Sequence, residues 1–196
     1  MEDANQDFYA RLQKENTKAL WQLISAESPA AHEPRPLAQP HIWKWQHVYP
    51  LLEEAIGVVD VGPLSERRVL VLTNPGLQNG TTHTLSGCVQ ILCPGESAPA
   101  HRHSAAAIRF IVKGSGACTT VDGEKIPMEE GDLILTPTMM WHEHSNETTG
   151  PVVWFDGLDV PFITFLNLDF FDPLPDGKQP ITKPDAFTTE NLTMAG

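Results

Sequence analysis

The chain has 196 residues, a formal net charge of −12 at pH 7 and 41% hydrophobic residues. This length suffices for one domain with a hydrophobic core plus extensions. The negative charge argues against nucleic acid or an anionic membrane as a partner. No stretch approaches the ~20 apolar residues that cross a bilayer, and the charged start resembles neither a signal peptide nor a basic transit peptide. We therefore expect a globular cytoplasmic protein.

The cysteine content excludes a disulfide scaffold. The chain has three cysteines, Cys88, Cys93 and Cys118, and no CxxC pair. An odd, low count in a chain of this size indicates neither a disulfide framework nor a thiolate zinc site. We expect all three thiols to be reduced and buried on strands, since free cysteine is among the most buried residue types.

The N-terminal third predicts a helix followed by an extended arm. Apolar residues at spacings of three and four predict a helix over 3–26. Closely spaced prolines then exclude regular structure over 32–40. Trp43 and Trp45 stand at strand spacing, and we expect them to hold this arm against the domain that follows. A short second helix is predicted over 49–56.

From Arg67 onward the pattern changes to alternation or to short apolar runs separated by turn signals such as Asp122-Gly123. Strands are predicted over 68–73, 87–93, 106–113, 116–121, 132–137 and 152–158. Many short strands with no helices between them predict an antiparallel, all-β barrel or sandwich. The segment after Phe171 is rich in proline and reads as a linker or an ordered arm. Three parts follow: 1–65, helix and wrapping arm; 66–172, barrel; 173–196, C-terminal arm or linker.

Three histidines are predicted to converge. His101 and His103 follow a turn-forming approach, and residues i and i+2 of a strand point to the same face. His142 lies beyond a glycine-bounded hairpin, so its segment can return antiparallel beside the first. Three imidazoles on neighbouring strands then define one triangular face. The remaining lone histidines are interpreted as surface or capped residues: His32, His41, His47 and His83.

A centre made of three neutral imidazoles leaves a divalent ion with its full charge and open coordination positions. Such a centre suits a chelating dianion, for example a 2-hydroxybenzoate, with a further position for O₂. Iron(II) fits this chemistry because it can pass electron density to O₂, which zinc cannot. The spacing alone does not exclude manganese, nickel or copper.

Two further residues stand at strand positions that point to the same face as the histidines. Arg109 lies six residues after His103, so on a continuous strand it faces the barrel interior and requires an anion. That anion is either a substrate carboxylate or a protein carboxylate, Asp156 or Glu143. His144 has the parity of His142 and is a candidate acid or base, or a merely structural imidazole.

Two ordered blocks of residues resemble the two motifs of the cupin superfamily. The matching positions are Gly95, His101, His103 and Gly114 in the first block, and Gly131, Pro137, His142 and Asn146 in the second. The resemblance implies an antiparallel jelly-roll barrel, here with an N-terminal helical extension. Ala107 and Ile108 stand where the first motif usually has a glutamate, so the site has no carboxylate ligand. Met139 replaces a usual glycine, which we interpret as a packing variation.

Four stretches are similar to gentisate 1,2-dioxygenase and to its salicylate and 1-hydroxy-2-naphthoate relatives: 66–70, 98–112, 131–144 and 154–161. The resemblance implies iron(II) on His101, His103 and His142, and a substrate pocket made of Gln90, Arg109, His144 and Asp156. It implies that the chain opens gentisate with O₂ to maleylpyruvate, with His144 and Arg109 as the catalytic candidates. Gln90 is otherwise a buried structural amide. Ser86 stands where these relatives tend to carry an aromatic residue, so the pocket differs there.

The relatives usually contain a second barrel, and this chain ends where the linker to it is expected. The chain is therefore either a fragment or a natural single-barrel form. The alternative functions are a non-catalytic or incomplete single-cupin module that binds a metal and an aromatic hydroxy acid, a salicylate or 1-hydroxy-2-naphthoate dioxygenase, or another cupin enzyme such as an isomerase or a thiol dioxygenase. The expected partners are a small aromatic hydroxy acid and O₂, with self-association into a homo-oligomer.

Overall fold

The structure, a computed structural model, describes residues 2–23, 36–59, 61 and 67–183. The chain divides into two compact units, Met1–Leu37 and Ala38–Gly196. Within the described ranges, no helix is long and apolar enough to cross a membrane. The predicted three-part division of the chain stays a prediction.

The first unit contains two helices, α1 (Glu2–Lys14) and α2 (Leu20–Leu23). Between them Asn16 adopts φ 51°, and the backbone N–H of Thr17 donates to the carbonyl of Leu12. A left-handed residue directly after the last turn ends an α-helix. The prediction of one continuous helix over 3–26 is therefore wrong between the two helices, and its part beyond residue 23 lies outside the described residues.

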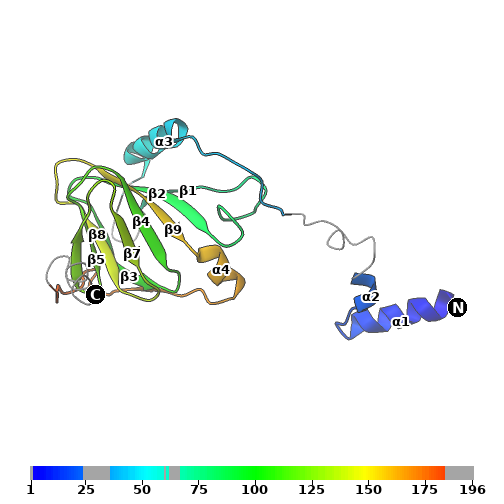
Figure 1. The fold of residues 1–196 in the computed structure, drawn as a ribbon. Coiled ribbons are helices and arrows are strands. Elements are labelled where there is room, and N and C mark those ends of the chain that lie inside the picture. The colour runs from blue at the N-terminus through cyan, green and yellow to red at the C-terminus, as the bar shows by residue number, and fades with distance from the viewer. Residues whose placement is uncertain (1, 24–35, 60, 62–66, 184–196) are drawn as a thin grey trace, which may run out of the picture. The chain divides into compact units, whose positions relative to one another are not determined.

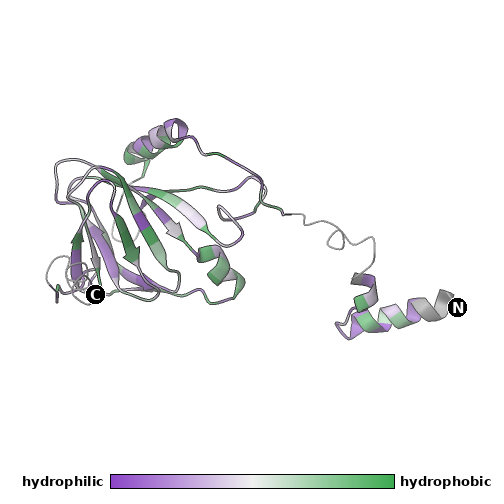
Figure 2. Cartoon of the chain, viewed as in Figure 1, coloured by the Kyte–Doolittle hydropathy of each residue, from purple (hydrophilic) through white to green (hydrophobic). Residues whose placement is uncertain are grey.

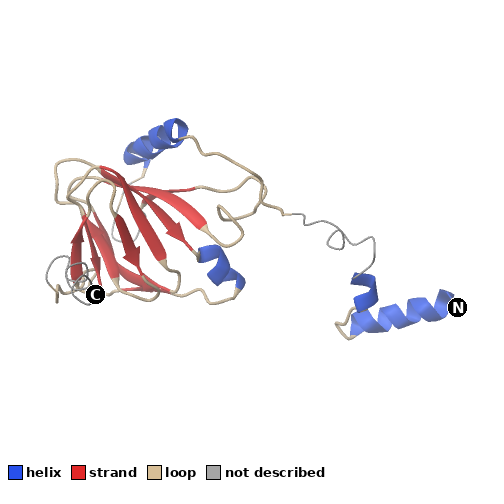
Figure 3. Cartoon of the chain, in the orientation of Figure 1, coloured by secondary structure: helices blue, strands red, loops and turns tan. Residues whose placement is uncertain are grey.

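The second unit is a barrel of two antiparallel five-stranded sheets (Figures 1 and 3). Sheet A has the order β1-β2-β9-β4-β7, and sheet B has the order β10-β3-β8-β5-β6. The strands are β1 (Arg68–Val71), β2 (Ser86–Leu92), β3 (Ser97–His103), β4 (Ala107–Lys113), β5 (Cys118–Val121), β6 (Glu124–Pro127), β7 (Leu133–Thr136), β8 (His142–Ser145), β9 (Val152–Leu158) and β10 (Phe171–Pro173). The predicted all-β cupin barrel is confirmed.

Alternation along sheet A builds two hydrophobic layers. One face packs between the sheets and contributes Leu92, Ile111 and Trp154 to the barrel core. The opposite face of β2 and β9 is also covered, because Leu52 of helix α3 (Trp45–Val58) packs there and is fully buried. All residues of β2 are consequently buried, and the strand reads as a continuous apolar run with polar exceptions. Figure 2 shows both hydrophobic and hydrophilic residues along α3.

Helix α3 begins earlier than predicted. The helix starts at Trp45 and contains Pro50 in its interior, whereas the predicted helix began at residue 49. The predicted extended segment holding Trp43 and Trp45 is therefore wrong at Trp45. Trp45 is 42% exposed and its ring contacts Tyr49. The arm is held on the barrel unit at Gln39, whose backbone N–H donates to Asn74 Oδ1 and whose carbonyl accepts from Asn74 Nδ2.

Most strand predictions agree with the structure to within a few residues, and 152–158 agrees at both ends. The sequence did not predict β6, β10 or helix α4 (Val160–Phe165) after β9. Since β10 pairs with β3, the proline-rich segment is an ordered arm as far as residue 183.

The three cysteines are free thiols, as expected. Cys88 is buried on β2, but Cys93 and Cys118 are only partly buried, so the prediction of three buried thiols is wrong for these two. Cys93 follows the last residue of β2 and Cys118 is the first residue of β5, and both positions lie at the end of the packed layers.

Candidate metal centre

Two neighbouring strands of sheet B bring three imidazoles together. His101 and His103 lie on β3, and His142 lies on β8 directly opposite His101 in the antiparallel register. The ring centroid of His142 is 4.1 Å from that of His101 and 4.8 Å from that of His103. One ring nitrogen from each residue lies within 4.8 Å of the other two, a spacing that fits a shared metal ion. The strand-parity argument thus places these rings correctly.

Each ring is oriented by a backbone carbonyl two residues away. The Nδ1 atoms lie 2.8 Å from Pro99 O for His101, 2.7 Å from Ala105 O for His103, and 3.0 Å from Met140 O for His142. A carbonyl oxygen can only accept, so each Nδ1 carries the proton and donates it. The Nε2 lone pair is then left for a metal ion, as in metal sites whose ligand tautomer is fixed by an outer hydrogen bond.

Burial keeps these rings neutral. Desolvation, followed by the charge of Arg67, lowers the pKa of His101 to about 2. Desolvation also lowers the pKa of His142 to about 3, and it lowers the pKa of His103. Since a histidine ligand must be deprotonated to bind a metal, the site is in its binding form at neutral pH.

Arg67 also belongs to this site. It was not predicted as a site residue, although it lies in the stretch 66–70 that is similar to the dioxygenases. Its Nη2 lies 2.9 Å from Nδ1 and 3.0 Å from Nε2 of His101. Because Nη2 is almost equally far from the two ring nitrogens, it lies over the face of the imidazole and not along the in-plane Nε2 lone pair. The Nε2 lone pair of His101 therefore stays available for a metal ion. Burial, followed by the charge of Arg109, lowers the pKa of Arg67.

A sequence signal for Arg67 exists in hindsight. Consecutive arginines that enter a strand point to opposite faces. Arg68 forms a 2.6 Å ion pair with Glu96 and donates to the carbonyl of Val59. Arg67 therefore takes the other direction, toward the imidazoles.

Arg109 has a protein carboxylate as its partner. Its Nε lies 3.0 Å from Oδ1 of Asp156, the residue opposite it in the β4–β9 register. Trp154 fixes the second carboxylate oxygen, because its Nε1 donates to Asp156 Oδ2 at 2.8 Å. Of the two acids considered from the sequence, Asp156 is the one in contact, whereas Glu143 accepts from the backbone of Gln179.

His144 is oriented as a neutral donor. Its Nδ1 lies 3.2 Å from Nη1 of Arg109 and 3.0 Å from Oγ1 of Thr119. A guanidinium has no acceptor, so Nδ1 must accept and the proton resides on Nε2. Burial and the nearby Arg109 charge lower the pKa of His144 well below its ordinary value. This geometry favours a hydrogen-bond donor over an imidazolium that gives up a proton.

Gln90 supplies an unused donor in the same barrel. It is 3% exposed, and its Nε2 is among the buried side-chain atoms with no hydrogen-bond partner in the described part of the chain. A buried amide N–H without a partner is costly, which favours a ligand-binding interpretation over a structural one. Ser86 lies on the same face of β2, and its hydroxyl is 3.8 Å from the Cys88 thiol.

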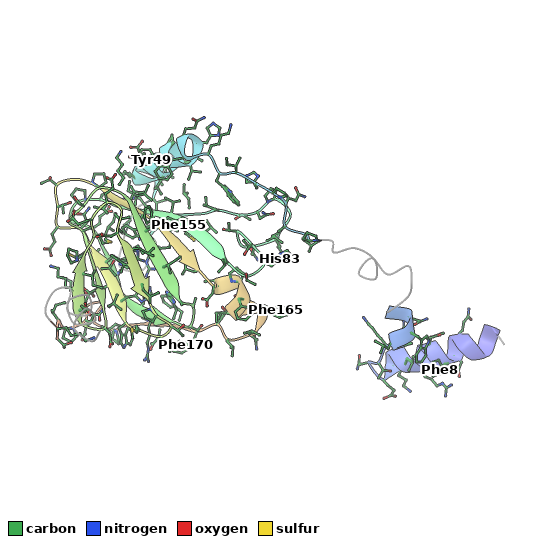
Figure 4. The ribbon with its side chains drawn as sticks, in the orientation of Figure 1. Phe8, Tyr49, His83, Phe155, Phe165 and Phe170 are labelled. Atoms are coloured by element: carbon green, nitrogen blue, oxygen red, sulfur yellow. The ribbon has the colours of Figure 1, made fainter. Side chains whose placement is uncertain are left out.

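Two openings lead toward the imidazoles. A pocket of about 440 Å³ is bordered by Arg67, Gln90, His101 and Phe171, and a second of about 300 Å³ is bordered by His103, Phe170 and Phe171. Figure 4 labels Phe170, on the segment that leads into β10, and Phe165, on helix α4. The ring of Phe171 stacks on His101, with centroids 5.3 Å apart. Phe171 therefore borders both entrances and contacts a predicted ligand.

Met139 has a left-handed backbone conformation, which explains the glycine that is usual at this position. Its φ is 64°, and its backbone N–H donates to the carbonyl of His103. The left-handed region is natural for glycine and strained for other residues. The usual glycine at this position is thus explained by backbone conformation, and the packing interpretation is wrong.

The comparisons with known proteins agree with this geometry. Residues 88–160 match the Cupin domain family. The match, the two-sheet barrel and the three convergent imidazoles make this chain a member of the cupin superfamily.

Within that superfamily the chain is similar to ring-cleaving enzymes. "Gentisate 1,2 dioxygenase 1" of Aquipseudomonas alcaligenes is 39% identical over 181 residues, covering 91% of this chain and 51% of the relative. A gentisate 1,2-dioxygenase of Ralstonia sp is 45% identical and covers 87% and 48%. The salicylate 1,2-dioxygenase of Pseudoaminobacter salicylatoxidans, solved as adducts with gentisate, has a TM-score of 0.82 at 38% identity, covering 93% and 50%. The chain spans about half the length of the relatives it matches.

Proposed function

We propose that this chain is the iron-binding barrel of an aromatic ring-cleaving dioxygenase that opens gentisate, 2,5-dihydroxybenzoate, with O₂. The bond between the carboxyl-bearing carbon and the adjacent hydroxyl-bearing carbon breaks, and both oxygen atoms enter maleylpyruvate. The observation that carries this proposal is the set of three neutral imidazoles whose Nε2 lone pairs converge while their Nδ1 atoms are held by carbonyls.

The donor set fits iron(II). His101, His103 and His142 would hold the ion, and the positions of the missing carboxylate ligand carry Ala107 and Ile108. Three neutral ligands leave the ion its full positive charge, which favours an anionic chelating substrate. Bound iron supplies the redox chemistry that links an electron-rich aromatic ring to O₂.

We assign the substrate carboxylate to Arg67 in preference to Arg109. Arg109 is neutralised by Asp156, whereas Arg67 forms no ion pair within the described ranges and contacts an imidazole. The guanidinium lies over the ring of His101, so it would remain beside an ion held by the three imidazoles. A partly buried cation in this position favours an anionic partner.

Two donors can orient the remaining substrate oxygens. His144 presents Nε2–H because its Nδ1 accepts from Arg109, and Gln90 has an unpaired Nε2. Arg109 and Asp156 then act as the support that keeps His144 in its donor tautomer. The proposal thus keeps Gln90 and His144 as residues that contact the substrate and changes the predicted roles of Arg109 and Asp156 from substrate binding to support.

Oxygen uptake tests the proposal. Protein loaded anaerobically with iron(II) is mixed with gentisate in the presence of O₂, and the absorbance of the ring-opened product is followed. We expect uptake and product in equal amounts. Iron binding with an altered spectrum on adding gentisate, but without uptake, would instead indicate a binding module or an incomplete catalytic unit.

A salicylate-type dioxygenase is the second candidate, favoured by the similarity to the salicylate enzyme. Salicylate lacks the 5-hydroxyl group of gentisate, so parallel assays with the two acids separate the alternatives. Turnover of gentisate alone supports the first proposal, and turnover of both supports the second.

Self-association accompanies this proposal. On the β4–β7 pair, Ile108 and Phe110 lie opposite Leu135 and Leu133, and all four side chains are exposed. Exposed apolar groups that adjoin one another favour association. Light scattering on the purified chain measures the oligomeric state.

A further inference from the structure

The residues that alternate with the histidines on β3 and β8 point away from the metal centre. Arg102 lies between the two histidines of β3, and Glu143 follows His142 on β8. Such outward positions of an antiparallel sheet are commonly free in solvent. Here both are bound by residues of the segment 171–183, which we call the C-terminal strap.

The first attachment of the strap is at β3. Strand β10 pairs in register with residues 101–103, and Asp172 Oδ2 lies 2.9 Å from Nε and 2.8 Å from Nη2 of Arg102. The same guanidinium lies 4.6 Å from the ring centre of Trp141, the residue before His142. The Asp172–Arg102 pair therefore connects β3 with the start of β8.

The second attachment is at β8 and the β5–β6 turn. The backbone N–H of Gln179 donates to Glu143 Oε2 at 3.1 Å. Its side-chain amide bridges the turn, because Nε2 donates to Thr120 O at 3.0 Å and Oε1 accepts from Gly123 N at 2.8 Å. A Cβ at Gly123 would collide with Thr182, so the strap lies directly against this turn.

The β3–β8 ladder needs this support at one point. The pairing register shifts between Ala98 and His101, so the two strands are irregularly paired where the first predicted ligand lies. A shift of this kind leaves a residue unpaired and disrupts the ladder locally. The strap bonds to the bulged stretch itself, because Leu174 N donates to Ala100 O and Ala100 N donates to Gly177 O.

We propose that the C-terminal strap is a positioning element of the metal centre. It acts through Asp172–Arg102 and Gln179–Glu143 and holds β3 and β8 at the spacing that lets three Nε2 atoms share one ion. This inference rests on the metal-binding part of the proposed function. The four residues are positioning residues, since their side chains point away from the imidazoles they serve.

Cobalt(II) binding to the full chain tests the strap, because cobalt reports both affinity and ligand geometry in its visible spectrum. Asp172→Ala removes the partner of Arg102, and Asp176→Ala is the matched control, an exposed acid in the same strap. We expect Asp172→Ala to weaken cobalt binding by about 10-fold or more and to shift the visible bands, as for lost outer partners of metal ligands. Asp176→Ala should leave both unchanged.

A structural role would produce a different result. The Asp172–Arg102 pair is about one-third exposed, and pairs of this kind contribute little to the unfolding free energy. The metal-free Asp172→Ala and wild-type proteins should therefore unfold at nearly the same temperature. In the double variant Arg102→Ala/Asp172→Ala, cobalt affinity should fall no further than in Arg102→Ala alone, because the ion pair is already removed in that single variant.

Glu143→Ala tests the second attachment independently, because it removes the acceptor of the Gln179 backbone N–H, and it should also weaken cobalt binding and shift the bands. Unchanged cobalt affinity and spectra in both Asp172→Ala and Glu143→Ala would overturn the inference. The inference would also be wrong if the variants that bind cobalt more weakly unfolded at clearly lower temperatures than the wild-type protein in the metal-free state. That result would assign the strap a structural role. If the wild-type chain bound no cobalt, the proposed metal centre itself would fail, and the inference with it.

Discussion

The two sheets of the barrel use the same alternation for different purposes. In sheet A the inward residues of β4 and β9 include Ile111 and Trp154, which are fully buried and apolar. In sheet B the inward residues of β3 and β8 include His101, His142 and His144, which are equally buried but polar. Burial alone therefore does not separate a core from a site. The polar groups of sheet B are oriented by fixed hydrogen bonds, and this identifies the site.

The outer faces differ in the same way. Sheet A is covered at strands β1, β2 and β9 by α3, which contributes the buried side chain of Leu52. Sheet B is contacted by the C-terminal strap, which contributes hydrogen bonds and the ion pairs Asp172–Arg102 and Lys183–Asp122. We expect substitutions in sheet A to change stability and substitutions in sheet B to change metal binding. Four predictions test this contrast.

The largest effect is expected from His142→Ala. Two imidazoles would remain, so the protein should lose its bound metal and its ring-cleaving activity together. The fold should persist, because the apolar core lies in other residues. Metal content after gel filtration, together with a thermal unfolding curve, measures both properties. Stoichiometric metal in this variant would remove His142 from the ligand set.

Asp156→Ala tests an exception to this contrast, because Asp156 belongs to sheet A but contacts Arg109 beside the metal centre. The variant leaves Arg109 buried without a counter-charge, so unfolding free energy should fall by about 3–5 kcal/mol. Urea denaturation measures the loss. The control is Asp156→Leu/Arg109→Met, which removes both charges and should recover most of the stability. A double variant as unstable as the single one would contradict the charge explanation.

Ile111→Ala tests whether a substitution in the core face of sheet A changes stability without changing metal binding. Ile111 is 0% exposed in the barrel core, so truncation should lower the unfolding free energy by about 3 kcal/mol. Cobalt affinity per folded molecule should stay at the wild-type value. A clear loss of affinity in the folded variant would show that the core layer also sets the ligand geometry.

Met139→Gly is expected to give the smallest effect, in the stabilising direction. Relief of the left-handed strain at φ 64° is worth about 1–2 kcal/mol, and the added freedom of glycine in the unfolded chain offsets about 0.5–1 of it. Met140→Gly is the matched control at a neighbouring position with ordinary φ, and it should destabilise. Equal signs for the two variants, in thermal unfolding, would contradict the strain argument.

The sequence correctly predicted which residues point to the same face of a strand. His101, His103 and His142 converge because alternate residues share a face, and Arg109 is interior for the same reason. The identity of the Arg109 partner could not be predicted. That depends on the register between β4 and β9, which brings Asp156 opposite Arg109 and has no local signal.

Other features required long-range information. The helix break at Asn16 results from one residue in the left-handed region, which helical periodicity does not reveal. The approach of Arg67 to His101 joins residues that are far apart in sequence. The strap was read as a linker or arm because prolines obscure strand patterns, although its carbonyls and N–H groups are bonded to β3 and the β5–β6 turn.

The acceptors that orient the three imidazoles are main-chain oxygens of Pro99, Ala105 and Met140. A substitution at any of these positions changes a side chain and leaves the acceptor in place. A mutation of the residue that accepts the hydrogen bond therefore leaves the tautomer of the histidine ligand unchanged. Sequence drift around the centre can alter the pocket wall without disturbing the direction in which the ligand nitrogens point. A barrel built this way can change its substrate over evolutionary time while it keeps its metal.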